Sequence, residues 1–112
     1  FFMVQLHPMI NFEDFQKVEI KIGTITEVVP VESSEKLLKL TVDFGDQTRQ
    51  VLSGIAKFYS PEDLLNKQFP FVTNLESRQI MGFESQAMIL AAGDEASLLQ
   101  PIKNVQNGTK IR

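Results

Sequence analysis

The chain has 112 residues, enough for one domain, and its 43% hydrophobic and 22% charged residues are ordinary shares for a folded protein. It contains no cysteine and a single histidine, His7, which excludes disulfides, cysteine nucleophiles and metal sites built from thiolates or paired histidines. The net charge of −3 is not the strongly basic balance of many nucleic-acid-binding domains, and no apolar run is long enough to cross a membrane. We therefore expect a protein that is not an enzyme and that uses no metal, no cofactor and no membrane contact.

The charge is unevenly distributed along the chain. Residues 1–35 carry two lysines and six acidic residues, whereas residues 36–57 carry four basic and two acidic residues. This distribution predicts a local basic face on an acidic protein. The chain begins with Phe1 rather than Met, and we expect either an upstream part of the protein or an initial residue to be missing.

The first predicted elements are a short helix and a long strand. The helix spans residues 12–16, with Asn11 as a suitable N-cap and two phenylalanines on one face. Apolar residues then alternate with polar ones, which predicts a strand over residues 18–30. The phase of the alternation shifts after Gly23, where we expect a β-bulge that lets the strand curl through a closed sheet.

The second and third predicted strands follow as a hairpin. A turn at Gly45 and Asp46 joins residues 38–44 to a third strand over residues 49–55. The second strand alternates regularly and is expected to direct four apolar side chains into the core. They are Leu38, Leu40, Val42 and Phe44.

A second short helix and a fourth strand come next. Ser60 is suited to be the N-cap of a helix that starts at Pro61 and ends near Asn66. The fourth strand is predicted over residues 69–75. It contains Pro70, which has no N–H group, so we expect that end of the strand at a sheet edge.

The fifth strand is predicted over residues 86–92. Residues 97–101 and 109–112 are expected to pair as short strands in the tail, with a turn at Asn107 and Gly108. Five short antiparallel strands with a helix between the third and fourth predict an all-β, five-stranded OB-fold barrel with a C-terminal extension. An SH3-like barrel or a small sandwich fits the strand count nearly as well, but the intervening helix favours the OB-fold.

Three stretches of sequence add a more specific signal. They are FEDFQKVEIKIGTI (12–25), SSEKLLKLTVDFG with RQVLSGIAKFYSPEDL (33–45 and 49–64), and NLESRQIMGFESQAMILAA (74–92). In order and spacing they resemble the tRNA-binding domain family, which includes the stand-alone bacterial tRNA-binding protein, the C-terminal domain of many methionyl-tRNA synthetases, an export chaperone and a eukaryotic cytokine precursor. The resemblance covers about residue 9 to the end. It implies an OB-fold that binds tRNA by its shape, as a homodimer, and catalyses no reaction.

The resemblance and the apolar ends of the chain together suggest a domain division and a function. We expect residues 1–10 to be an N-terminal extension at a dimer interface, and residues 11–112 to be the tRNA-binding OB-fold domain, with its C-terminal extension from about residue 93. The expected function is cytoplasmic, structure-specific tRNA binding by a homodimer, either alone or as the C-terminal appendix of the methionyl-tRNA synthetase catalytic portion. The alternative is a dimerisation or chaperone-like protein-interaction module with weak RNA affinity.

The resemblance also implies five candidate tRNA contacts, namely Lys36, Asn74, Arg78, Ser85 and Met88. Arg78, expected in a loop between the fourth and fifth strands, offers a planar guanidinium to phosphate. Asn74 and Ser85 can donate to phosphate or ribose oxygens. Met88 offers a soft apolar surface to a base, and Lys36 and Lys39 add positive charge on the barrel's flank. Judged without the resemblance, Met88 also fits a core position, Asn74 a turn, and Ser85 a local bond to the backbone.

Two departures from the family pattern predict weak tRNA binding. Glu76 and Ser77 stand where the family commonly has a Lys-Pro pair before the matched arginine, which exchanges a positive charge for a negative one. Ala87 stands in place of a frequent glycine, and its methyl group leaves less space for another backbone to approach this position. We expect these changes to lower RNA affinity without altering the fold or the dimer.

Overall fold

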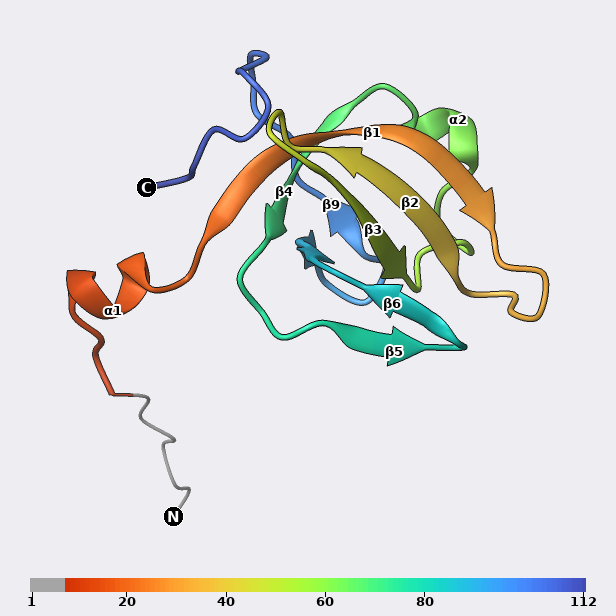
Figure 1. Cartoon of the computed structure of the whole chain (residues 1–112), viewed down its shortest axis with the longest axis horizontal. Coiled ribbons are helices and arrows are strands. Elements are labelled where there is room, and N and C mark those ends of the chain that lie inside the picture. The colour runs from red at the N-terminus through yellow and green to blue at the C-terminus, as the bar shows by residue number, and fades with distance from the viewer. Residues whose placement is uncertain (1–7) are drawn as a thin grey trace.

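The main sheet contains five antiparallel strands in the computed structural model, which describes residues 8–112 (Figure 1). These strands are β1 (Ile20–Pro30), β2 (Leu38–Asp43), β3 (Thr48–Ser53), β4 (Gln68–Val72) and β7 (Met88–Ile89). Their order in the sheet is β3-β2-β1-β4-β7. The short helix α2 (Pro61–Leu64) falls between β3 and β4 along the chain, so the predicted OB-type barrel is confirmed.

The long first strand closes much of the barrel by itself. The part of β1 from Ile20 to Thr24 pairs with β4, and the part from Thr24 to Pro30 pairs with β2. On the far side, β3 meets the short strand β6 (Phe83–Ser85), where the Gln86 N–H donates to the Gln50 carbonyl at 2.9 Å. The result is a nearly closed antiparallel barrel.

Gly23 has a different role from the predicted one. The register shift between β1 and β2 falls between Ile25 and Glu27, so the β-bulge lies beyond Gly23. A Cβ atom added at Gly23 would lie 2.6 Å from a Val42 methyl carbon and 2.8 Å from the Phe44 ring. The prediction of a bulge at this glycine is therefore wrong, because the missing side chain allows close packing of β1 on the core rather than a bend.

Alternation along β2 builds the core as predicted. Its inward side chains and Phe44, which follows the strand, are at most 2% exposed. The Phe44 ring packs edge-on against Phe71 of β4, with ring centroids 5.4 Å apart and planes at 85°. These contacts join the β2 side of the barrel to the β4 side.

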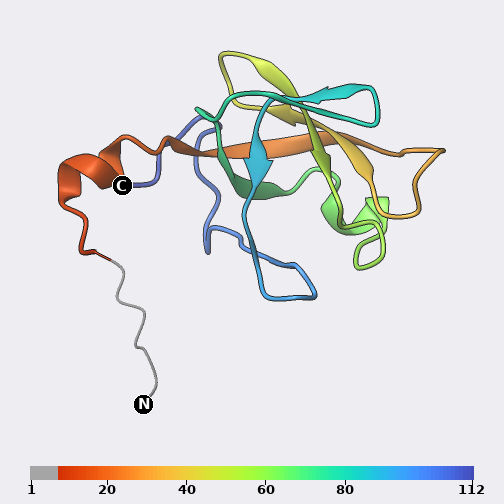
Figure 2. The ribbon, with the colours of Figure 1, turned by 90° about the horizontal axis from the view of Figure 1, so that it is seen from below.

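Both short helices begin where the capping residues predict. In α1 (Phe12–Gln16), the Asn11 side chain accepts a hydrogen bond from the Asp14 N–H at 2.8 Å. Ahead of α2, the Ser60 N–H donates to the Asp63 carboxylate at 2.9 Å. Helix α1 projects from the barrel on the same side as the C-terminus (Figure 2).

Pro70 lies in the end of β4 that has a ladder partner on one side only, as predicted. It stands opposite Ile22 of β1, whereas the pairing of β4 with β7 covers only Phe71 and Val72. The Ile22 N–H donates to the Thr109 carbonyl at 2.9 Å, and the Ile22 carbonyl accepts from the Gly108 N–H at 2.7 Å. Because Ile22 directs both groups away from β4, the missing N–H of Pro70 removes no bond from the ladder with β1.

The segment before the predicted fifth strand forms a hairpin instead of a loop. Strand β5 (Arg78–Ile80) pairs with β6, which follows after two residues. Those two residues, Met81 and Gly82, have φ angles of 53° and 83°. Positive values at both central positions are typical of the type I′ turn that suits a two-residue hairpin.

The tail also pairs differently from the prediction. The strand expected over residues 86–92 divides into β7 and β8 (Ala91–Ala92), because β8 pairs with β9 (Ser97–Leu98) outside the main sheet. The last residues do not pair with the β9 segment, since Lys110 forms a bridge to Lys21 of β1. The turn at Asn107 and Gly108 is confirmed, and Gly108 has a φ angle of 90°.

The predicted N-terminal extension, residues 1–10, lies mostly outside the described residues. Within residues 8–112, no helix is both long enough and apolar enough to cross a membrane.

Candidate nucleic-acid interface

Arg78 is the first residue of the β5–β6 hairpin, where the prediction placed a loop. Its side chain is exposed, and it stands directly opposite Ser85. Directly opposite residues of an antiparallel pair point to the same face, so Arg78 and Ser85 share one side of the hairpin. In the described part of the chain, the Arg78 guanidinium has neither a hydrogen-bond nor an ion-pair partner. It is therefore available to an external anion.

Ser85 is buried and fastens the hairpin to β3. Its hydroxyl oxygen accepts from the Leu52 N–H at 3.0 Å, and its hydroxyl donates to the Ala87 carbonyl at 3.2 Å. Beside it, the Gln86 side chain accepts from the Gln50 N–H at 2.9 Å. The hydroxyl therefore takes the place that a main-chain carbonyl has in a regular ladder, and together with the Gln86 bonds it holds the hairpin against β3.

A cavity of about 90 Å³ lies between the hairpin, β3 and β7. Three of the five predicted contact residues line it, namely Arg78, Ser85 and Met88. Met88 is 45% exposed, so it belongs to the surface rather than the core. Glu76 lines the same cavity, so an acidic residue shares the site with the arginine. The remaining lining residues are Leu52, Ser53, Leu75, Ile80, Ala87 and Ile89.

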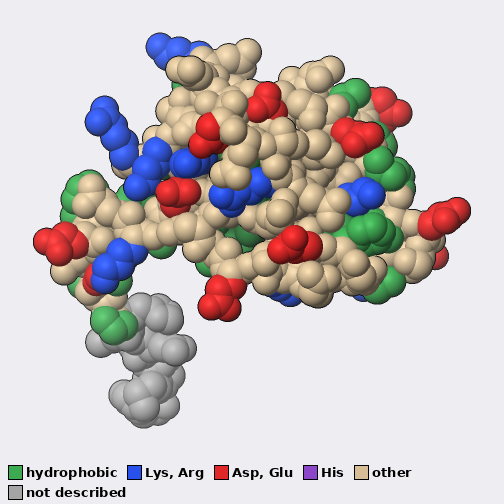
Figure 3. Space-filling model, viewed as in Figure 1, with side chains coloured by type: hydrophobic (Ala, Val, Ile, Leu, Met, Phe, Trp, Pro, Cys, Tyr) green, Lys and Arg blue, Asp and Glu red, His purple; other side chains and the backbone are tan. Residues whose placement is uncertain are grey.

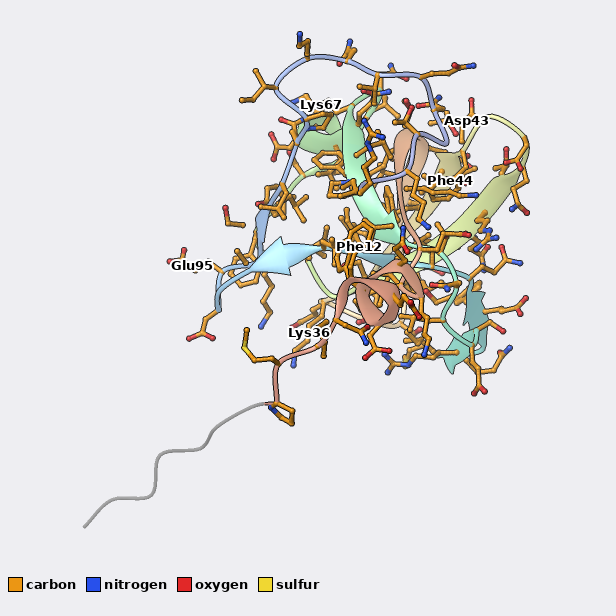
Figure 4. All side chains as sticks on the ribbon, turned by 90° about the vertical axis from the view of Figure 1, so that its left-hand side faces the viewer. Phe12, Lys36, Asp43, Phe44, Lys67 and Glu95 are labelled. Atoms are coloured by element: carbon orange, nitrogen blue, oxygen red, sulfur yellow. The ribbon has the colours of Figure 1, made fainter. Side chains whose placement is uncertain are left out.

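Asn74 and Lys36 do not line this cavity. The Asn74 side chain accepts from the Glu19 N–H at 2.8 Å and donates to the Lys17 carbonyl at 2.6 Å. It thereby joins the end of β4 to the start of β1. Lys36 is exposed in the loop between β1 and β2, on the opposite side of the barrel from Lys67 (Figure 4).

A comparison with known families identifies the domain. Residues 20–110 match the model of the family described as "Putative tRNA binding domain". The chain belongs to this family. A tRNA-binding domain of this kind is a non-catalytic module, and its barrel is the scaffold on which the Arg78 cavity lies.

Similar proteins include both large ligases and small single-domain proteins. The methionine–tRNA ligase of Methanoregula boonei is 56% identical over 94% of this chain, and that of Caldanaerobacter subterraneus is 44% identical over 91%. The chain spans only 16% of the length of each ligase.

Two solved structures share the architecture over their whole length. A MetRS-related protein from Pyrococcus horikoshii superposes with a TM-score of 0.86 at 30% identity, covering 95% of this chain and 100% of that one. The chaperone CsaA from Bacillus anthracis superposes with a TM-score of 0.86 at 35% identity, covering 94% and 100%. The domain therefore occurs both within long ligases and as a short chain.

The tRNA-binding domain also contains two lysines that lie close together in the fold, which the sequence analysis did not predict. Lys21 and Lys110 are bridge partners at the start of β1, and the Lys21 ammonium lies 3.5 Å from the Glu19 carboxylate. The Thr73 hydroxyl donates to that carboxylate at 2.6 Å, and this bond, helped by the Lys21 charge, lowers the pKa of Glu19 despite partial burial. Basic side chains gather on this side of the molecule with acidic ones among them (Figure 3). Nearly the whole chain separates the two lysines, so no local pattern links them.

The basic face expected from residues 36–57 is not continuous. Arg49 of β3 directs its guanidinium inward, where it donates to the carbonyls of Thr73 and Gln86 at 2.5 and 3.1 Å. It therefore stabilises the closure of the barrel and is not a free cation for RNA.

Proposed function

We propose that this tRNA-binding domain contacts tRNA through the cavity at Arg78 and serves as the non-catalytic, tRNA-binding part of a cytoplasmic methionyl-tRNA synthetase. The observation that supports the contact most directly is the meeting of Arg78, Ser85 and Met88 around one exposed cavity. The 56% identity to a methionine–tRNA ligase over 94% of the chain supports attachment to a catalytic portion.

Arg78 grips the RNA backbone in this proposal. Its exposed guanidinium can bind a phosphate through two parallel hydrogen bonds, and Met88 beside it offers an apolar surface to a ribose or a base. Ser85 and Asn74 act as positioning residues, because their polar atoms are already bonded within the barrel. Lys36 adds charge from the neighbouring loop. Contacts of this kind read the shape of tRNA more than its sequence.

Glu76 limits the affinity. This residue lines the cavity that contains Arg78, and its negative charge repels phosphate. The chain as a whole has a net charge of −3. A module of low affinity still helps a ligase, because its contact with a tRNA already held by the catalytic portion is intramolecular and has a high effective concentration.

We also propose that the domain is a homodimer. An apolar groove of about 460 Å³ lies between α1, β1 and the C-terminal segment. Helix α1, which lines the groove through Phe15, also has exposed apolar residues within it and just before it: Met9, Ile10 and Phe12 are 96%, 65% and 63% exposed. A two-fold interface can place these residues of each copy on the groove of the other, which buries both apolar surfaces at once.

The same groove supports the second candidate function, a dimerisation or chaperone-like module. Its lining includes Phe15, Ile20, Ile22, Leu90, Leu99 and Ile111.

Filter binding with unfractionated tRNA over a salt series tests the main proposal. We expect saturable binding that weakens as salt increases, because phosphate contacts release counterions. Arg78→Ala should weaken it, whereas Lys67→Ala should not. Lys67 is an exposed cation that follows α2, which lies on the other side of the barrel from β5 (Figure 1). No binding of tRNA at low salt would exclude the proposal and favour the interaction module.

A further inference from the structure

A second hollow, of about 560 Å³, lies between the loop that follows β1 and the β5–β6 hairpin. It has no lining residue in common with the cavity at Arg78. The end of β1 contributes an apolar wall, the loop adds polar groups, and the strands β2 and β6 each contribute one side chain. The lining consists of Val29, Pro30, Val31, Glu32, Ser33, Lys39 and Phe83.

Lys39 and Phe83 are in contact in this hollow. The Lys39 ammonium nitrogen lies 4.9 Å from the centroid of the Phe83 ring, and both residues are half-buried. This is a cation–π contact, and at a partly exposed site such a contact is weak. The lysine stem is flexible, so the ammonium can leave the ring without disturbing β2. The ring is therefore a surface that another flat group can occupy.

Hydrogen bonds hold both walls of the hollow in place. In the loop, the Ser34 hydroxyl oxygen accepts from the N–H groups of Lys36 and Leu37 at 3.1 and 3.2 Å. The Val31 N–H donates to the Leu37 carbonyl at 3.2 Å. The hairpin is fastened to β3 through the buried Ser85 hydroxyl. A hollow formed in advance requires little ordering when a ligand enters.

We propose that this hollow binds one unpaired nucleotide of tRNA, with its base stacked on Phe83 and its phosphate contacted by Lys39. The inference rests on the proposed tRNA binding and extends it from the RNA backbone to a base. The charges of Lys39 and Glu32 balance, so the site does not select a free anion, whereas its apolar and aromatic lining suits a base.

The hairpin connects this hollow to the Arg78 cavity. Phe83 stands opposite Ile80, which lies two residues beyond Arg78 on β5. Two residues of a strand span about 7 Å, and opposite residues share a face, so one RNA strand can reach both sites. The hairpin therefore supplies a backbone contact and a base contact to the same RNA.

The test compares wild type with Phe83→Ala, Phe83→Trp and Phe58→Ala, each titrated with tRNA and with a fully paired, blunt-ended RNA duplex. Losing one stacked base should weaken tRNA binding roughly 5- to 150-fold and leave duplex binding unchanged. Phe83→Trp keeps a stacking surface and should keep tRNA affinity. Phe58→Ala is the matched control, because Phe58 is 44% exposed and lines a different hollow.

A further Phe83 variant and a crosslinking measurement separate loss of the site from loss of the fold. Phe83→Leu retains apolar bulk on the hairpin and should weaken tRNA binding with an unchanged thermal melt, and ultraviolet crosslinking should attach a nucleotide to the peptide containing Phe83. Two results would show that the hollow is not a nucleotide site. Either Phe83→Ala and Phe83→Leu bind tRNA as well as wild type does, or they lose affinity for the duplex in parallel with affinity for tRNA. In both cases a protein segment becomes the favoured ligand of the hollow. If wild type binds no tRNA, the proposed function itself fails.

Discussion

Replacing Gly23 with alanine tests the packing of β1 on the core. The added Cβ would lie 2.6 Å from a Val42 methyl carbon and 2.8 and 2.9 Å from two Phe44 ring carbons. Real Cβ atoms do not approach other heavy atoms that closely, and β1 is paired with β4 at this residue, so the strand cannot simply move outward. We expect Gly23→Ala to destabilise the fold.

The magnitude follows from two opposing effects. Adding one methyl group to a packed core costs about 1–3 kcal/mol, whereas replacing glycine reduces the entropy of the unfolded chain by about 0.4–1 kcal/mol. The midpoints of these two ranges leave a net loss of about 1.3 kcal/mol. For a domain of this size, that corresponds to a decrease in Tm of roughly 4–8 °C. Urea unfolding followed by circular dichroism, together with a thermal melt, measures both quantities.

Gly54→Ala is the matched control, because no atom lies within 4 Å of a Cβ added there. Because only the entropic effect remains, Gly54→Ala should be as stable as wild type or more stable by up to about 1 kcal/mol. The cost of Gly23→Ala should also be smaller in a Val42→Ala background, where the closest contact is absent. Wild-type stability for Gly23→Ala would refute the packing argument and restore a conformational role for this glycine.

The remaining predictions concern RNA affinity, assembly and pH. Arg78→Ala should weaken tRNA binding roughly ten- to a hundred-fold in filter binding, because a charge-assisted hydrogen bond contributes about 1.5–3 kcal/mol. Glu76→Lys should strengthen tRNA binding. If both variants bind tRNA with wild-type affinity, the Arg78 cavity is not the tRNA site. Phe12→Glu should give monomers in sedimentation where wild type gives dimers, and a monomeric wild type would contradict the interface. Thr73→Val should lower stability at pH 7, because Thr73 lowers the pKa of Glu19 below its ordinary 4.5 and so stabilises the folded state above that pH. Urea unfolding should show this difference shrinking as pH falls below 4.5, and an equal difference at pH 3 would refute the linkage.

The candidate site was partly predictable from the sequence. Arg78 and Met88 were chosen by resemblance, and both are exposed at one cavity. Ser85 and Asn74 were chosen in the same way, but their polar atoms bond to backbone groups 33 and 55 residues away. The contact between Lys39 and Phe83 was missed, since the two residues belong to different strands and no local spacing relates them.

The sequence by itself determined the features that depend on neighbouring residues. The cap at Asn11, the turn at Gly108 and the alternation along residues 38–44 each follow from side chains a few positions apart. Only the tertiary structure decided why Pro70 removes no hydrogen bond between β4 and β1 and why Gly23 must lack a side chain. Both answers depend on atoms that strand pairing brings from distant parts of the chain, and a local pattern contains no record of those neighbours.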